Sequence, residues 1–255
     1  NGLSLKWSGI PIIASNMTTT GTFEVYNVLC SHNIVTAFHK FYSLEEYKIA
    51  NKTYKLNPDL FMVSTGINDA DFIRLKDILE QIDCNWICID IANGYISNVI
   101  SFCAKVRREF PNKIIVAGNV TTSEGVERLC DAGANVIKVG IGPGSACTTR
   151  IQTGIGMPQL SALLECAETA HKRGAYVLSD GGITCPGDVS KALGAGGDFV
   201  MIGGEFAGHD ENPGEIIEEN GVKFKLFYGM SSAYAMELNY GKMEKYRSSE
   251  GCKMK

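Results

Sequence analysis

Eight short apolar runs, each followed by a helical pattern, constrain the fold of this chain more than any other feature of its sequence. Most of the runs are nearly uninterrupted by polar residues, which is typical of strands buried on both faces of a parallel sheet. The predicted strands span 11–15, 34–39, 60–65, 86–92, 113–119, 136–141, 176–180 and 199–202. Three intervening helices, predicted at 69–82, 96–110 and 159–173, repeat apolar residues at spacings of three and four.

Eight such repeats within about 200 residues predict an α/β fold, a single (β/α)8 TIM barrel over 1–255. A doubly wound sheet is the alternative. It is disfavoured because no Gly-x-Gly-x-x-Gly motif follows the first strand.

Composition limits the classes of function. The chain has 255 residues, is 45% hydrophobic and carries a formal net charge of −4, so no basic excess suggests a nucleic-acid surface. No apolar run reaches the roughly 18 residues of a membrane helix, and no signal peptide is visible. The nine cysteines lie within strand-like or helix-like segments, as free thiols do in a reducing compartment. We therefore expect a soluble cytoplasmic protein that binds neither nucleic acid nor membrane.

The expected strand ends point to one face of the barrel, because the C-terminal ends of barrel strands form the active face. All eight ends are polar or glycine-rich, and the last two are the pairs Gly181-Gly182 and Gly203-Gly204. Each pair is expected to precede a helix, so its backbone N–H groups predict a phosphate site. Asp180 is placed to bond a ribose diol, or else to cap the following helix.

The sixth strand runs into a loop, 140–150, in which glycines and a proline precede Cys147. An ionised thiol is a strong nucleophile, and loop N–H groups or Arg150 can favour its ionisation. Thr149 is a candidate proton relay, provided that a carboxylate such as Glu250 polarises it. The alternatives are a buried structural cysteine, a turn hydroxyl and a solvated surface glutamate.

The pattern changes from residue 220 onward. Residues 221–228 alternate like a hairpin strand, 229–232 form a turn into a helix starting near Ala233, and 241–255 are polar. We interpret 220–255 as an active-site hairpin followed by a mobile lid.

Two rival functions remain open on the residues alone. Lys138 lies within the sixth strand, where a lysine can form a Schiff base, as in imine-forming aldolases. A non-catalytic nucleotide-binding or scaffold protein is the other. The aldolase reading leaves Cys147 and the Gly-Gly loops unexplained.

The loop 140–150 resembles the cysteine loop of the IMP dehydrogenase/GMP reductase family. Further segments are similar to the GMP reductase branch of that family, and they extend the match over nearly the whole chain: 89–95, 153–162, 165–167, 227–232 and 246–251. The short connection 41–59 agrees, since most dehydrogenases of the family carry a regulatory domain there. An IMP dehydrogenase lacking that domain, oxidising IMP to XMP with NAD, is the main alternative.

The resemblance implies NADPH-dependent reductive deamination of GMP to IMP and ammonia, a step of purine interconversion. Cys147 would attack purine C2, Thr149 and Glu250 would protonate the departing amine, and a covalent thioimidate would result. The resemblance also implies a homotetramer and a bound monovalent cation, K⁺.

The resemblance further implies which residues bind each ligand. The nucleotide would contact Asp180, Gly181, Gly182, Gly203, Gly204, Gly229, Met230, Ser231, Arg247, Ser248, Ser249, Glu250 and Gly251. The cofactor would face Lys40, Asp90, Ile91, Ala92, Ile141, Gly142, Met230, Tyr246 and Arg247. The cation would be held by carbonyls around Gly142, Gly144 and Cys147, with Arg150 beside them.

The chain departs from the family pattern in a few places. Thr18 replaces an aspartate and Met157 replaces a tyrosine, and neither change removes a catalytic group. The family pattern also continues beyond both ends, so we expect both termini to be trimmed.

Overall fold

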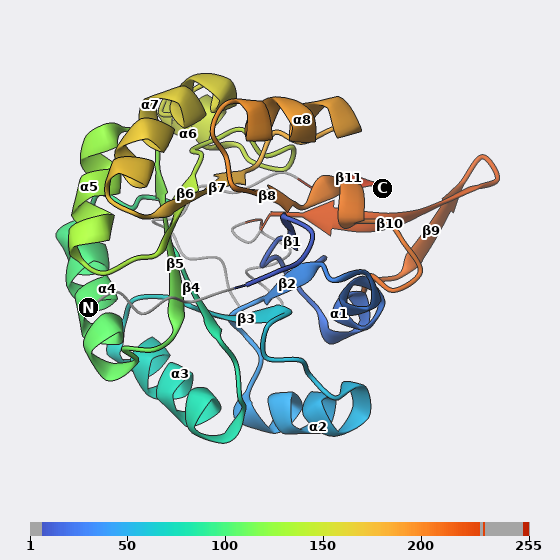
Figure 1. Cartoon of the computed structure of the whole chain (residues 1–255). Helices are drawn as coiled ribbons and strands as arrows, with labels where there is room; N and C mark the ends of the chain where they lie inside the picture. Colours follow the sequence, from blue (N-terminus) through green and yellow to red (C-terminus); the bar gives the residue numbers. More distant parts are fainter. Residues whose placement is uncertain (1–6, 230–231, 233–251, 255) are drawn as a thin grey trace.

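The computed structural model describes residues 7–229, 232 and 252–254. Eight parallel strands close into a barrel in sequence order, with helices around it (Figure 1). The predicted (β/α)8 barrel is therefore confirmed. The strands are β1 (Ile12–Ala14), β2 (Val35–Phe38), β3 (Phe61–Thr65), β4 (Trp86–Asp90), β5 (Ile114–Val120), β6 (Val136–Val139), β7 (Tyr176–Asp180) and β8 (Phe199–Ile202).

The helices of the described chain follow the strands. They are α1 (Phe23–Leu29), α2 (Leu44–Tyr54), α3 (Asp69–Gln81), α4 (Ser97–Glu109), α5 (Ser123–Asp131), α6 (Thr149–Thr153), α7 (Gln159–Lys172) and α8 (Pro186–Gly194). The three helices predicted from apolar spacing agree with α3, α4 and α7 to within about one residue at each end. Side-chain caps fix where two of these helices begin. Ser43 and Glu46 form a capping box at the N-terminus of α2, and Asn68 and Asp71 form one at the N-terminus of α3.

The N-terminal end of the barrel is closed by aromatic side chains. Trp7 packs against Trp86, the first residue of β4, with ring centroids 5.9 Å apart, and against Phe199, the first residue of β8, at 5.5 Å. The indole N–H groups of Trp7 and Trp86 both donate to the carbonyl of Asp59, at 2.9 and 3.2 Å. This end is packed like a core, so a ligand site has to lie at the other end.

The chain beyond β8 differs from expectation in one respect. A helix was expected after Gly203-Gly204, but the structure has a single 3₁₀ turn, η2 (Gly204–Phe206), and that expectation was wrong. The chain then enters a loop that Asn212 ties down by donating to the carbonyl of Thr19 at 2.7 Å. This tertiary hydrogen bond holds the loop that follows η2 against the loop after β1.

The predicted hairpin strand is confirmed as β10 (Val222–Tyr228), which pairs antiparallel with β9 (Ile216–Glu219). The hairpin projects away from the barrel (Figure 1). A third strand, β11 (Cys252–Met254), pairs with the end of β10 that is nearer the barrel. The predicted helix near Ala233 and most of the proposed lid lie outside the described residues.

Candidate active site

A cavity of about 560 Å³ opens at the C-terminal ends of the barrel strands. Its size is that of a nucleotide or cofactor pocket. Residues from the ends of β1, β4, β6, β7 and β8 line it, together with the loop 140–149 and Gly229 at the end of the hairpin. Several of the strand ends expected to form the active face therefore line one common cavity.

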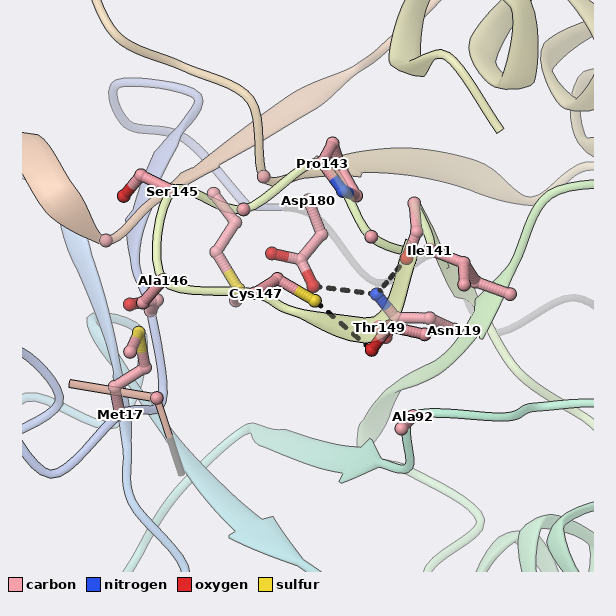
Figure 2. A pocket seen from close by; sticks show the side chains of 18 of the residues that line it. Met17, Ala92, Asn119, Ile141, Pro143, Ser145, Ala146, Cys147, Thr149 and Asp180 are labelled. Carbon is pink, nitrogen blue, oxygen red and sulfur yellow. Dashed lines mark hydrogen bonds between the residues drawn. The ribbon is translucent and has the colours of Figure 1, made fainter. Parts of the chain in front are cut away.

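The loop after β6 presents Cys147 at this cavity. A turn closes just before the thiol, since the N–H of Cys147 donates to the carbonyl of Gly144 at 3.0 Å. The thiol in turn lies 3.3 Å from the hydroxyl of Thr149, the first residue of α6, and donates to it (Figure 2). The expected nucleophile and the expected proton relay are thus in hydrogen-bond contact, which sequence spacing alone did not establish.

Other cysteines of the described chain lie in a different environment. Burial raises the pKa of Cys84, Cys88, Cys103 and Cys166 to about 12. Thiols that stay protonated in the core are poor nucleophiles. Cys147 is half-buried and faces the cavity, so it is the thiol of the barrel that a ligand there can reach.

Asp180, the last residue of β7, lies opposite this thiol in the same cavity (Figure 2). The Asn119 side-chain amide donates to its Oδ2 at 2.8 Å and to the carbonyl of Gly140 at 2.7 Å. The Lys138 ammonium lies 3.1 Å from the same Oδ2 and also binds Oδ1 of Asp90. The expected cap role for Asp180 is not seen among the described contacts.

The ion pairs of Lys138 bear on the Schiff-base alternative. Burial alone would lower the pKa of Lys138, but the attraction of Asp180 and Asp90 raises it well above its usual range. A Schiff-base lysine must lose its proton to attack a carbonyl. Lys138 is held as a cation, so its environment disfavours an imine-forming aldolase.

The loop after β7 packs directly on the cysteine loop. Gly181 adopts a φ of +90°, and a Cβ there would lie 3.0 Å from Pro143 and 3.1 Å from the amide nitrogen of Gly144. Both the left-handed backbone and the close approach require glycine. Gly182, Gly203 and Gly204 line the same cavity, and α8 begins with Pro186 a few residues after the first pair.

The residues expected to face a cofactor come from the ends of β2, β4 and β6. Lys40, Asp90, Ile91, Ala92, Ile141 and Gly142 all line the cavity. Two backbone hydrogen bonds fix Ile91 to the end of β5. The N–H of Ile91 donates to the carbonyl of Gly118 at 3.1 Å, and the N–H of Asn119 donates to the carbonyl of Ile91 at 2.8 Å. Next to them the buried Asn119 Oδ1 has no hydrogen-bond partner among the residues that the structure describes, so this part of the lining fits a ligand that brings a donor.

The proposed cation ligands are backbone oxygens of the loop, the type of donor that K⁺ takes. The carbonyl of Gly144 already accepts from Cys147, but a carbonyl oxygen has a second lone pair. Arg150 packs against Gly142 and donates to the carbonyl of Met157, so it braces the loop. Among the described residues, no cluster of histidine, cysteine and acidic side chains suits a transition metal.

A family model described as "IMP dehydrogenase / GMP reductase domain" matches residues 5–255. The chain belongs to the IMP dehydrogenase/GMP reductase family. The resemblance seen in the sequence is thereby confirmed. Similar relatives include proteins named GMP reductase from Shigella boydii serotype 18 and Citrobacter koseri. Each is 54% identical to this chain over 249 residues, which is 96% of this chain and 72% and 71% of the relatives. The same name, identity and coverage apply to a relative from Escherichia coli K12.

The family's expected contacts at Met230, Ser231, Tyr246 and 247–251 lie outside the described residues. This group includes Glu250, the proposed partner of Thr149. Of the C-terminal contacts, Gly229 is placed at the cavity. Among the described residues no helix combines the length and the apolar character needed to cross a bilayer.

Sequence reasoning did not select two residues that contact Asp180 in the structure. Asn119 and Lys138 hold Asp180, yet neither was among the predicted site residues. A signal was present for Asn119, because it is a polar residue at the end of an apolar strand. Lys138 was considered only as a Schiff-base lysine, because a lysine inside a barrel strand is also typical of imine-forming aldolases.

Proposed function

We propose that this chain is a GMP reductase that converts GMP to IMP and ammonia at the expense of NADPH. The observation that carries the proposal is the thiol of Cys147, which faces a nucleotide-sized cavity and lies 3.3 Å from the hydroxyl of Thr149. Relatives of this chain that are named GMP reductase support the choice within the family.

The nucleotide is oriented by the part of the cavity that lies at the ends of β7 and β8. Asp180 accepts hydroxyls of the ribose, while backbone N–H groups near Gly181, Gly182, Gly203 and Gly204 bind the phosphate. The purine ring then extends toward the cysteine loop. This orientation brings C2 of the guanine within reach of the Cys147 sulfur.

Cys147 acts as the nucleophile. Its thiolate forms a bond to C2, and the C–N bond to the exocyclic amino group breaks after that nitrogen has been protonated. Thr149 delivers the proton, with Glu250 as its source, and the loss of ammonia from the C2 adduct leaves a covalent thioimidate on Cys147. A positioned acid of this kind contributes about 10²–10⁴-fold to the rate.

The second half of the reaction restores the thiol. NADPH supplies a hydride to C2 when it is bound along Lys40, Asp90, Ile91, Ala92, Ile141 and Gly142. The C–S bond then breaks, Cys147 leaves as thiolate and IMP is released. The overall reaction takes up two protons with GMP and NADPH and yields IMP, NADP⁺ and ammonium.

The rest of the assembly belongs to the same proposal. Residues 220–255 act as hairpin and lid, bringing Met230, Ser231, Tyr246 and 247–251 over the ligands. Carbonyls of Gly142, Gly144 and Cys147 hold K⁺, and the chain works as a cytoplasmic homotetramer built on a single barrel domain.

Two spectrophotometric assays test the function on the same preparation. NADPH oxidation with GMP, accompanied by release of ammonia, is the expected activity. Reduction of NAD⁺ with IMP, in the absence of the first activity, would identify an IMP dehydrogenase and overturn the proposal.

A further inference from the structure

One charged cluster lies between the two proposed ligand positions. The Lys138 ammonium contacts Asp180, assigned to the nucleotide, and Asp90, assigned to the cofactor. The two carboxylates are 90 residues apart in sequence and lie on β7 and β4. Lys138 is 1% exposed, so this cation has no bulk water to compensate it.

Strand register explains how Lys138 reaches Asp90. Asp90 on β4 is level with Gly118 on β5, and Gly118 is level with Lys138 on β6. Side chains level with each other point to the same face of a sheet. A Cβ on Gly118 would lie 2.5 Å from the Cβ of Lys138, so only glycine leaves the gap through which the ion pair forms.

The hydrogen bonds at Asp180 are one-sided. Asn119 and Lys138 both bind Oδ2, at 2.8 and 3.1 Å. Oδ1 has no hydrogen bond from the described residues. The carboxylate is therefore fixed in rotation by one oxygen, and the other is left to accept hydroxyl groups of a ligand.

We propose that Lys138 is a positioning residue shared by both subsites: one ammonium orients Asp180 for the ribose of the nucleotide and Asp90 for the cofactor. This inference rests on the proposed function. If the two carboxylates were oriented separately, no single substitution would affect both subsites. With a shared ammonium, a substitution at Lys138 weakens the binding of GMP and of NADPH together.

The central variant is Lys138→Met, which keeps the length of the side chain and removes the charge. We expect the KM for GMP and the KM for NADPH each to rise at least about 10-fold, with a smaller fall in kcat, because two buried carboxylates lose a charged partner. Asp90→Asn alone should raise the KM for NADPH and leave the KM for GMP within about 3-fold of wild type.

A second variant keeps the test decisive if Lys138→Met fails to fold. Lys138→Met with Asp90→Asn removes one positive and one negative charge, so the net charge of the cluster is unchanged. Its KM for GMP should stay at least about 10-fold raised, since Asp180 still lacks the ammonium. Lys113→Met is the matched control, because Lys113 precedes β5 at the closed end of the barrel and pairs with Asp83 at 3.6 Å.

Thermal melting identifies the folded variants, and calorimetric titration with IMP measures nucleotide binding without turnover. A folded Lys138→Met protein that keeps both KM values within about 2-fold of wild type would overturn the shared role. So would one in which the KM for only one of the two substrates rises. If wild type fails to turn over GMP, the proposed function fails by itself. IMP titrations then decide the role at the nucleotide: unchanged affinity in the double variant overturns it, and a loss of at least about 10-fold supports it.

Discussion

The two ends of the barrel are made by the same eight strands and have opposite chemistry. At the N-terminal end Trp7, Trp86 and Phe199 pack edge to face or tilted, and the indole N–H groups share one carbonyl. At the C-terminal end a cavity of about 560 Å³ contains a thiol, two carboxylates and a buried ammonium.

The difference shows how one barrel separates stability from chemistry. Burying apolar surface stabilises the closed end, where the indole N–H groups of Trp7 and Trp86 are both hydrogen-bonded. Burying Lys138 costs desolvation that is offset only while its carboxylate partners are present. Substitutions at the closed end should therefore change stability, and substitutions at the open end should change binding and rate.

The largest expected effect is at the open end. Cys147→Ala removes the nucleophile and should lower kcat by at least about 10⁴-fold, while GMP binding and melting temperature stay near wild type. Single-turnover kinetics measure the rate of the chemical step, and calorimetric titration measures the affinity for GMP. Cys30→Ala, which changes a half-buried thiol that follows α1 and does not line the cavity, is the control and should remain active. An active Cys147→Ala protein would refute the role of the thiol.

A substitution at the closed end should lower the free energy of unfolding and leave substrate binding unchanged. Trp86 is 1% exposed, and Trp86→Ala should lower the free energy of unfolding by about 3–5 kcal/mol by leaving a cavity. Urea unfolding measures this loss, and KM values at low temperature should be unchanged. Trp86→Phe keeps a ring and should cost less. A variant with raised KM values and unchanged stability would break the separation between the two ends.

The smallest effect expected is a pH dependence at His39, next to β2 on the open side but outside the main cavity. Burial lowers the pKa of His39 to about 4, and its Nδ1 accepts the N–H of Phe41 at 3.3 Å. The unfolded chain binds a proton near pH 6.5 and the folded chain only near pH 4, so this residue removes stability as pH falls through that window.

His39→Gln should abolish that contribution. Between pH 7 and pH 5 wild type should lose about 2 kcal/mol more unfolding free energy than the variant. Urea unfolding at the two pH values gives the difference. Equal losses in the two proteins would show that His39 is protonated in the folded state.

Much of the fold followed from the sequence, because the buried parallel strands are nearly uninterrupted apolar runs and the helices between them repeat apolar residues at a regular spacing. The prediction of a helix after Gly203 was wrong. The chain makes only the short turn η2 there, and the Asn212 side chain then holds the following loop by donating to the Thr19 carbonyl. The third strand of the hairpin sheet was also missed, because β11 carries no alternating pattern and is defined by its pairing with β10.

The sequence by itself determined the barrel, the family and the loop that carries Cys147, since each depends on residues adjacent in the chain. Only the tertiary structure decided how Lys138 is used. Its partners lie 48 and 42 residues away, and they meet because barrel closure and strand register bring β4, β6 and β7 together across Gly118. The charge state of a buried lysine depends on which groups surround it in space, and here two carboxylates in contact with Lys138 favour the cation over an imine-forming amine.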